Sequence, residues 1–293
     1  MFTRSAPRLL LAASALFFGA AYFTVRFPEV PGSSVGSFVS TLLIALPSFI
    51  ALKRFLAFKR AALSLLALSV LGFAIETTGV ATGFPYGPFY YGESLGPKFA
   101  DLVPYLLPLS WVPLVLGAVA AMAPRRTRES RFAIRDSYSS LLPTPDSLLP
   151  GAKRPRAKLL LSAVVLLTLV DGVLDPGATS LGFWVWPEGG SYYGVPITNY
   201  LGWLFSSSLA VALLIALGRC RWESVPPSPG LLDSAIISAA FWTGVDAISG
   251  LLFPAVLGAV LYLLLLSRRI QLAAGGGSRY KGGGEDDERG LKV

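Results

Sequence analysis

The sequence contains no histidine and a single cysteine, Cys220. Without histidine, the chain cannot build a histidine-ligated haem, a histidine-based zinc site or a nucleophile activated by histidine. A single cysteine excludes a disulfide within the chain. Acid–base chemistry therefore depends on aspartate, glutamate, tyrosine, lysine or water.

Charged residues are also scarce. They make up 14% of the 293 residues, whereas 53% are hydrophobic and the mean hydropathy is +0.61. Soluble domains carry about 25% charged residues. Long apolar stretches explain such a composition better than a soluble core does, so the sequence predicts an integral membrane protein.

Apolar stretches divide the chain into membrane-length segments. Several have about 17 residues, near the lower limit for crossing ~30 Å of hydrocarbon. The block 231–267 is too long for one helix, and Ser249, Gly250 and Pro254 predict a tight hairpin within it. We therefore predict an all-α, polytopic membrane helix bundle of about eight transmembrane helices, at 9–25, 35–52, 61–76, 104–123, 159–175, 200–217, 231–247 and 251–267.

The distribution of basic residues predicts the orientation of these helices. With eight spans and both termini cytoplasmic, every lysine and arginine except Arg26 and Lys98 falls on the cytoplasmic side. This pattern predicts a multi-pass plasma-membrane protein whose first helix is retained; cleavage of that helix as a signal peptide is the alternative. Orientation explains the basic charge, so we expect membrane lipids and no nucleic acid as partners.

The same map gives the domain organisation. A transmembrane domain, 1–267, contains the basic, proline-containing cytoplasmic loop 124–158 between two four-helix halves. The glycine-rich tail 268–293 has no P-loop order, and we expect it to be disordered and cytoplasmic.

Acidic side chains gather at one predicted depth. Glu76 ends the third predicted span, Asp171 and Asp175 end the fifth, and Asp246 ends the seventh, all on the outer side. Carboxyl groups at membrane depth usually face the bundle interior and mark functional sites. These four residues are therefore the candidate catalytic groups.

The loops beyond Glu76 and Asp175 resemble one another. They read "TTGVATGFPYGPFYYG" and "PGATSLGFWVWPEGGSYYGVPITNYLGW", and 90–92 in the first matches 192–194 in the second. This weak internal repeat predicts a site at the interface of two halves. We expect it to be lined by aromatic side chains, with Asn199 holding water; the candidate substrate-binding residues are Tyr91, Trp184, Trp186, Tyr193, Asn199 and Trp203.

Acids beside aromatic rings suit carbocation chemistry. An acid kept neutral by apolar surroundings can protonate an alkene, and each well-placed ring face stabilises the resulting cation by about 0.5–2 kcal/mol. A second carboxylate can then deprotonate an incoming water or the cation itself. We hypothesise that Glu76 or Asp175 donates the proton and that the other, with Asp171 or Asp246, activates water. This chemistry needs no metal and no redox cofactor.

Two segments, "IETTGVATGFPYGPFYYGESLGPKF" and "LDPGATSLGFWVWPEGGSYYGVPITNYLGW", carry a resemblance to a known family. They resemble the signature regions of the CruF-type carotenoid biosynthesis proteins, which include carotenoid 1,2-hydratases and bisanhydrobacterioruberin hydratases. The resemblance covers roughly residues 60–255. It implies cofactor-free addition of water across a terminal C=C of an acyclic carotenoid in the bilayer, giving a tertiary alcohol.

Other functions fit parts of the pattern. Intramembrane acids also occur in proton-coupled transporters. Asp171 and Asp175 form an Asp-x-x-x-Asp spacing that can hold Mg²⁺ in a membrane prenyltransferase. A cyclase would share the alkene protonation step. A retinal-binding pump is disfavoured because no lysine lies in the middle of a predicted span.

Overall fold

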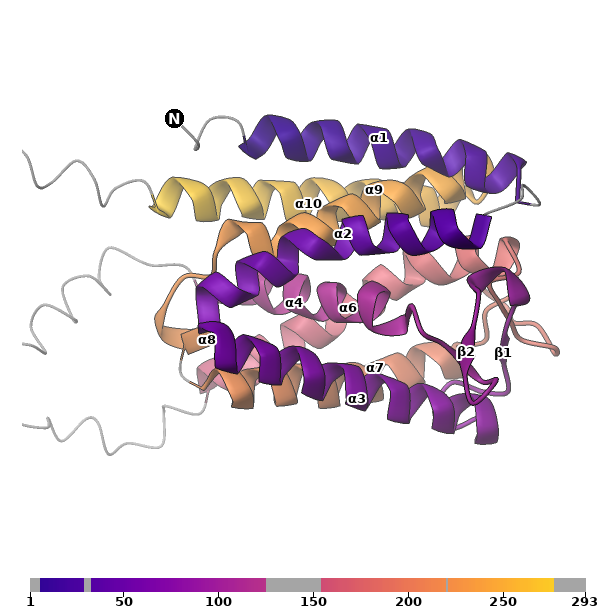
Figure 1. Ribbon diagram of the computed structural model, residues 1–293, viewed down its shortest axis with the longest axis horizontal. Helices are drawn as coiled ribbons and strands as arrows, with labels where there is room; N and C mark the ends of the chain where they lie inside the picture. The colour runs from indigo at the N-terminus through magenta and orange to yellow at the C-terminus, as the bar shows by residue number, and fades with distance from the viewer. Residues whose placement is uncertain (1–5, 29–32, 125–153, 220, 277–293) are drawn as a thin grey trace, which may run out of the picture.

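The computed structural model describes residues 6–28, 33–124, 154–219 and 221–276 (Figure 1). Within them, seven helices are long and apolar enough to cross a membrane. This confirms the predicted all-α, polytopic membrane bundle. The helices concerned are α1 (Ala6–Arg26), α2 (Ser33–Leu56), α3 (Phe58–Thr82), α6 (Arg154–Ser180), α7 (Ile197–Gly218), α9 (Asp233–Ile248) with the 3₁₀ turn η4 (Pro229–Leu232) before it, and α10 (Leu252–Gly276).

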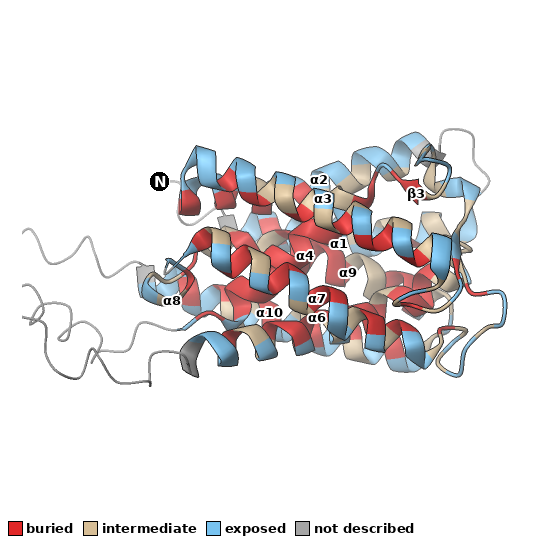
Figure 2. Cartoon of the chain, turned by 90° about the horizontal axis from the view of Figure 1, so that it is seen from below, coloured by how far each residue is buried: buried red, intermediate tan, exposed pale blue. Residues whose placement is uncertain are grey.

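The remaining predicted span, 104–123, is a shorter helix than expected. Helix α4 covers Leu107–Met122, and its 16 residues rise roughly 24 Å, less than the ~30 Å of hydrocarbon. Its residues 111–121 are all buried, and Figure 2 shows it at the centre of the bundle. Contacts with α2, α3, α6 and α9 surround it. Helix α4 is therefore the core helix around which the others pack.

The predicted break in the block 231–267 is confirmed. Helix α9 ends at Ile248, Gly250 adopts a φ of 76°, and α10 begins at Leu252. A positive φ favours glycine because other residues meet a steric penalty there. Helix α10 continues past the predicted end at 267 to Gly276. The tail from 277, and residues 125–153 of the predicted cytoplasmic loop, lie outside the described residues.

The bundle has two chemically different ends. Helix α1 begins and α10 ends at one end, where α8 (Arg221–Ser224) also lies (Figure 1). Basic residues at this end include Lys53 and Arg54 in the last turn of α2. The opposite end carries the two loops that join α3 to α4 and α6 to α7. The orientation of these ends in the membrane remains a prediction.

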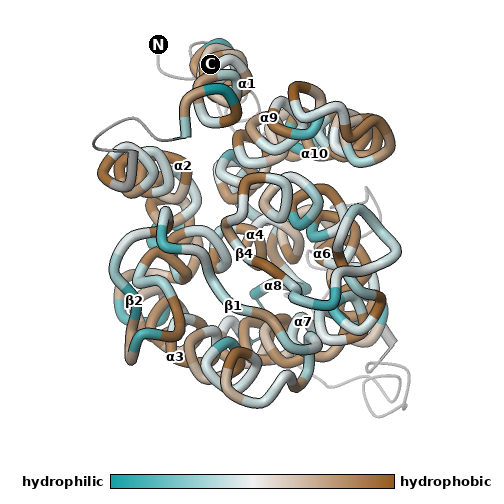
Figure 3. Tube along the Cα trace, turned by 90° about the vertical axis from the view of Figure 1, so that its right-hand side faces the viewer, coloured by the Kyte–Doolittle hydropathy of each residue, from teal (hydrophilic) through white to brown (hydrophobic). Residues whose placement is uncertain are grey.

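Two short antiparallel ribbons close the second end. Strand β1 (Tyr90–Tyr91) pairs with β4 (Trp184–Val185), and β2 (Lys98–Phe99) pairs with β3 (Val103–Pro104). The first ribbon joins the two halves of the chain, and Figure 3 shows β1 and β4 across the middle of this end. Glycines with positive φ follow both helices that lead into it, Gly83 after α3 and Gly182 after α6.

Candidate active site

Three of the predicted acids meet beneath the β1–β4 ribbon. Glu76 comes from α3, and Asp171 and Asp175 come from successive turns of α6. All three are buried, with 7%, 1% and 3% of their surface exposed. Asp171 and Asp175 lie within hydrogen-bonding range of each other, and Glu76 lies close enough to interact electrostatically with both. We call these three side chains the carboxyl cluster.

Asn199, in the first turn of α7, bridges the two aspartates. Its Nδ2 donates to Asp171 Oδ2 at 3.0 Å and also to Asp175 Oδ2. Trp184 Nε1 donates to the other oxygen of Asp175, Oδ1, at 3.1 Å. Among the described residues, the buried Asp171 Oδ1 has no hydrogen-bond partner. The two aspartates of one helix therefore have different surroundings.

Two tyrosines hold Glu76. The Tyr91 hydroxyl donates to Glu76 Oε2 at 2.8 Å, and the Tyr86 side chain interacts with both Glu76 and Ser206 of α7. Burial, and then the adjacent carboxyl of Glu76, raise the pKa of Tyr91 well above its usual value. The same causes raise the pKa of Tyr86. Both phenols therefore stay protonated and available as donors.

The β1–β4 ribbon relates the acids of the two halves. Tyr91 and Trp184 are direct partners in its register, and each donates to the acid of its own half, Glu76 and Asp175 respectively. Glu76 and Asp175 stand at the same sequence distance before a glycine of positive φ. Glu76 and Asp175 thus occupy equivalent places in the two halves, whereas the matched tyrosines of 90–92 and 192–194 do not.

Aromatic rings pack around the cluster. Phe89 lies with its ring centroid 5.4 Å from that of Tyr91 and 5.8 Å from that of Trp186. Trp186 is buried, and Trp203 packs against the same group of side chains. Of the predicted lining residues, Trp184 contacts a carboxyl directly, and Trp186 and Trp203 belong to the aromatic group that packs with Tyr91.

Asp246 does not join the carboxyl cluster. It is fully buried, and neither of its oxygens has a partner among the described residues. Its Oδ1 would lie 2.7 Å from a Cβ placed on Gly177, so it packs against α6 beyond Asp175. The electrostatic neighbour that the structure gives it is Tyr192. Asp246 is therefore a separate buried acid.

Tyr193 also stands apart, because 42% of its surface is exposed. Its neighbour Tyr192 turns inward instead and donates from its hydroxyl to the backbone oxygen of Gly172 at 2.9 Å. Tyr192 and Tyr200 form an edge-to-face pair next to the aspartates. Sequence reasoning placed neither of these two, nor Tyr86, among the site residues. The one indication in the sequence was that all three lie in the two quoted loop segments, which are rich in aromatic residues.

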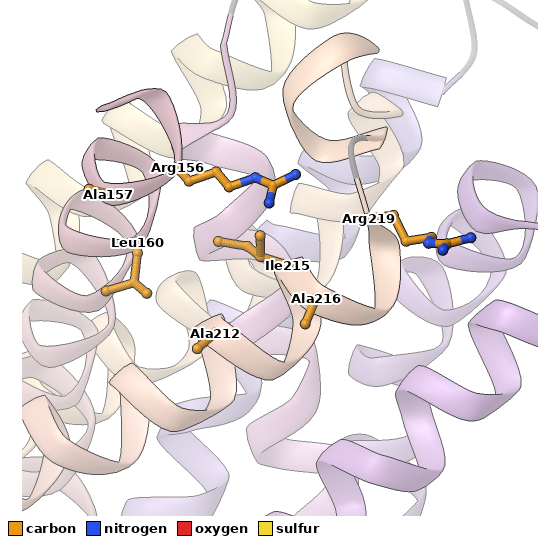
Figure 4. Close-up of a pocket in the computed structure, with 7 residues that line it drawn as sticks. All are labelled: Arg156, Ala157, Leu160, Ala212, Ile215, Ala216 and Arg219. Carbon is orange, nitrogen blue, oxygen red and sulfur yellow. The ribbon is translucent and has the colours of Figure 1, made fainter. Parts of the chain in front are cut away.

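A cavity of about 430 Å³ lies at the opposite end of the bundle (Figure 4). It opens between α6 and α7, and Arg156 at its rim is hydrogen-bonded to Glu223 of α8. From Arg156, α6 rises roughly 22 Å to Asp171. The cavity is therefore separate from the carboxyl cluster; it is lined by Arg156, Ala157, Leu160, Ala212, Ile215, Ala216 and Arg219.

The described part of the chain holds no group of three or more Asp, Glu, Cys or His side chains arranged for a metal ion. Instead, Asp171 and Asp175 accept hydrogen bonds from Asn199 and Trp184. Lys98, the basic residue of the nearby loop, pairs with Glu93 at 2.6 Å. The two aspartates are thus engaged by neutral donors.

Comparison with known proteins identifies the family to which this sequence is similar. A family model described as "Carotenoid biosynthesis protein" matches residues 32–265, which include the whole carboxyl cluster and the ribbon above it. The chain belongs to the carotenoid biosynthesis protein family. No solved structure gives a significant match to it.

One protein similar to this chain is bisanhydrobacterioruberin hydratase of Haloarcula japonica. The two sequences are 38% identical over 192 residues, which is 64% of this chain and 57% of that protein. The match thus extends over little more than half of the relative's length.

Proposed function

We propose that the protein hydrates a terminal C=C of an acyclic carotenoid end and so produces a tertiary alcohol. The observation that carries this proposal is the cluster of three buried carboxyls beneath an aromatic ribbon. Membership of the carotenoid biosynthesis family supports the substrate class. The name of the Haloarcula relative, a hydratase, supports the reaction type.

The reaction begins with protonation of the alkene by a carboxyl of the cluster. A new C–H bond forms at the less substituted carbon, and a tertiary carbocation results. The rings of Tyr91, Trp184 and Trp186 stabilise the cation, each by about 0.5–2 kcal/mol where its face is presented. A carboxylate of the cluster adds electrostatic stabilisation at short range.

Water then captures the cation. A second carboxyl accepts a proton as the new C–O bond forms, so the net change is alkene plus water to alcohol. One proton is given and one is received, so transfer of a proton from the acceptor to the donor restores both groups. The chemistry uses side chains of this chain and needs no added cofactor.

The substrate reaches the site from the membrane. Carotenoids are apolar and dissolve in the bilayer, and the bundle exposes many large apolar side chains around its outside. We propose the plasma membrane as the location, with lipid and carotenoid as the partners. The carboxyl cluster lies beneath the β1–β4 ribbon, and Figure 1 shows β1 at the end of the bundle opposite the start of α1 and the end of α10.

The test is expression in a bacterium that accumulates an acyclic carotenoid, followed by chromatography and mass spectrometry of the pigments. The proposal expects a more polar pigment heavier by the mass of one or two waters. Glu76→Gln and Asp175→Asn should each lower the yield by at least about 100-fold at equal protein level, since general acid–base catalysis contributes roughly 10²–10⁴-fold and electrostatic stabilisation roughly 10²–10³-fold. Unchanged yields in both variants would overturn the proposed roles.

A further inference from the structure

The two aspartates of the carboxyl cluster differ in how many donors they meet. Both oxygens of Asp175 accept hydrogen bonds, Oδ1 from Trp184 and Oδ2 from Asn199. Asp171 accepts at Oδ2 from Asn199, whereas its Oδ1 is buried without a partner among the described residues. A carboxyl group whose oxygens both accept is stabilised in its ionised form. The oxygen left without a donor is the one that has room for a proton.

The bridge through Asn199 strengthens this distinction. A primary amide has two N–H groups, and that of Asn199 donates to both aspartates, one N–H to each. Two carboxyls within hydrogen-bonding range cannot both be ionised without a nearby cation. Among the described residues the cluster's hydrogen-bond donors are all neutral: Tyr86, Tyr91, Trp184 and Asn199. The two aspartates therefore share one proton. Asp171 Oδ1, which accepts no hydrogen bond from the described residues, is the oxygen that carries it.

We propose that Asp171 is the catalytic proton donor and Asp175 the base that activates water. This assignment rests on the proposed function and replaces the earlier hypothesis that Glu76 or Asp175 is the donor. The Asp171 O–H bond breaks as the alkene C–H bond forms. Water then attacks the cation, and Asp175 takes the proton that water releases.

The cycle closes inside the pair. After capture of the cation, Asp175 carries a proton and Asp171 carries none, and the two carboxyls lie within hydrogen-bonding range. Transfer of that proton from Asp175 to Asp171 restores the starting state. Glu76 lies in the other half of the chain, where Tyr86 and Tyr91 hydrogen-bond to it. It serves as the carboxylate that stabilises the cation.

The experiment uses the full chain in lipid vesicles with an acyclic carotenoid, in D₂O. Without a base for water, Asp175→Asn still allows Asp171 to protonate the alkene and to take a proton back from a carbon beside the cation. The recovered substrate should therefore gain deuterium while hydration falls at least about 100-fold. Asp171→Asn should lose both deuterium uptake and hydration, and Asp171→Glu, which keeps the acid, should recover part of both.

Controls separate the possible failures. Glu188→Gln removes an exposed acid in the loop between α6 and α7 and should behave as the unmodified protein. Equal thermal unfolding of the detergent-solubilised variants shows that Asp171→Asn is folded. Deuterium uptake or hydration at the unmodified rate in folded Asp171→Asn would overturn the assignment, and so would loss of uptake in Asp175→Asn. Absence of hydration by the unmodified protein would instead contradict the proposed function itself.

Discussion

At the scale of single residues, Tyr91 and Trp184 each contribute a hydrogen-bond donor to the carboxyl cluster as well as an aromatic ring. Tyr91→Phe keeps the ring and removes the hydroxyl that donates to Glu76. A hydrogen bond to a charged group contributes about 1.5–3 kcal/mol. We expect the rate of hydration to fall by roughly 10- to 100-fold, measured as initial rate in membranes.

Tyr90→Phe provides the matched control. Tyr90 is the neighbour of Tyr91 in the same strand, but 51% of its surface is exposed. Its hydroxyl makes no hydrogen bond to the carboxyl cluster in the described structure. We expect an unchanged rate. Equal losses in the two variants would show that the ribbon, and not the Tyr91 hydroxyl, determines activity.

The paired tyrosines show what the sequence could predict at this scale. Alignment of the two loops placed Tyr193 opposite Tyr91, yet Tyr192 is the one whose hydroxyl enters the bundle. In the first half the tyrosine pair forms the strand, whereas in the second half the strand is Trp184–Val185. The tyrosines of the second half therefore fall in a later turn, where Tyr193 has a φ of 51°. Residue spacing alone does not reveal that change.

At the scale of elements, close approach between the loop 83–89 and α7 positions Tyr86. A Cβ on Gly202 would lie 2.5 Å from Tyr86 Cδ1 and 2.7 Å from the Pro85 backbone oxygen. Gly202→Ala must displace that loop, because the backbone oxygen cannot rotate away. We expect a loss of about 1–3 kcal/mol in unfolding free energy and a lower hydration rate.

Gly19→Ala in α1 is the control for that substitution. Apart from the neighbouring backbone of α1 itself, no described atom lies within 4 Å of a Cβ at Gly19, and alanine favours a helix interior by about 0.8–1.0 kcal/mol over glycine. Its thermal midpoint should be equal or higher, and its activity unchanged. A Gly202→Ala protein as stable and active as the Gly19→Ala protein would show that the loop has room to move.

The elements themselves were largely predictable. Apolar runs predict helices because backbone groups in hydrocarbon must be satisfied within the segment. Helix ends were less certain, since α10 extends beyond its apolar run and α4 is shorter than predicted. The β1–β4 ribbon was not predicted: it has two residues per strand, and its pairing joins loops far apart in the sequence.

At the scale of the whole molecule, the orientation in the membrane is open to direct measurement. The positive-inside pattern predicts that Glu188 faces outward and Lys53 faces the cytoplasm. In a Cys220→Ser background, single cysteines at these exposed positions report the side. A membrane-impermeant maleimide should label position 188 in intact cells and position 53 after permeabilisation. The reverse pattern would place the carboxyl cluster on the cytoplasmic side.

Convergence of the acids is the whole-molecule property that sequence predicted in part. Glu76 meets the aspartates of α6 because the two halves pack so that their outer loops pair. Asp246 stands at a similar predicted depth, yet it packs behind Gly177. Depth along a helix follows from the sequence, whereas the rotation of each helix about its axis depends on packing against its neighbours.

The most direct test of the account is hydration by the purified protein in lipid vesicles, in H₂¹⁸O and without added cofactor. The carboxyl cluster predicts a tertiary alcohol that carries ¹⁸O, and at least about 100-fold less of it with folded Asp171→Asn. A folded, unmodified protein that forms no alcohol from acyclic carotenoids, or an alcohol whose oxygen does not come from water, would contradict the account.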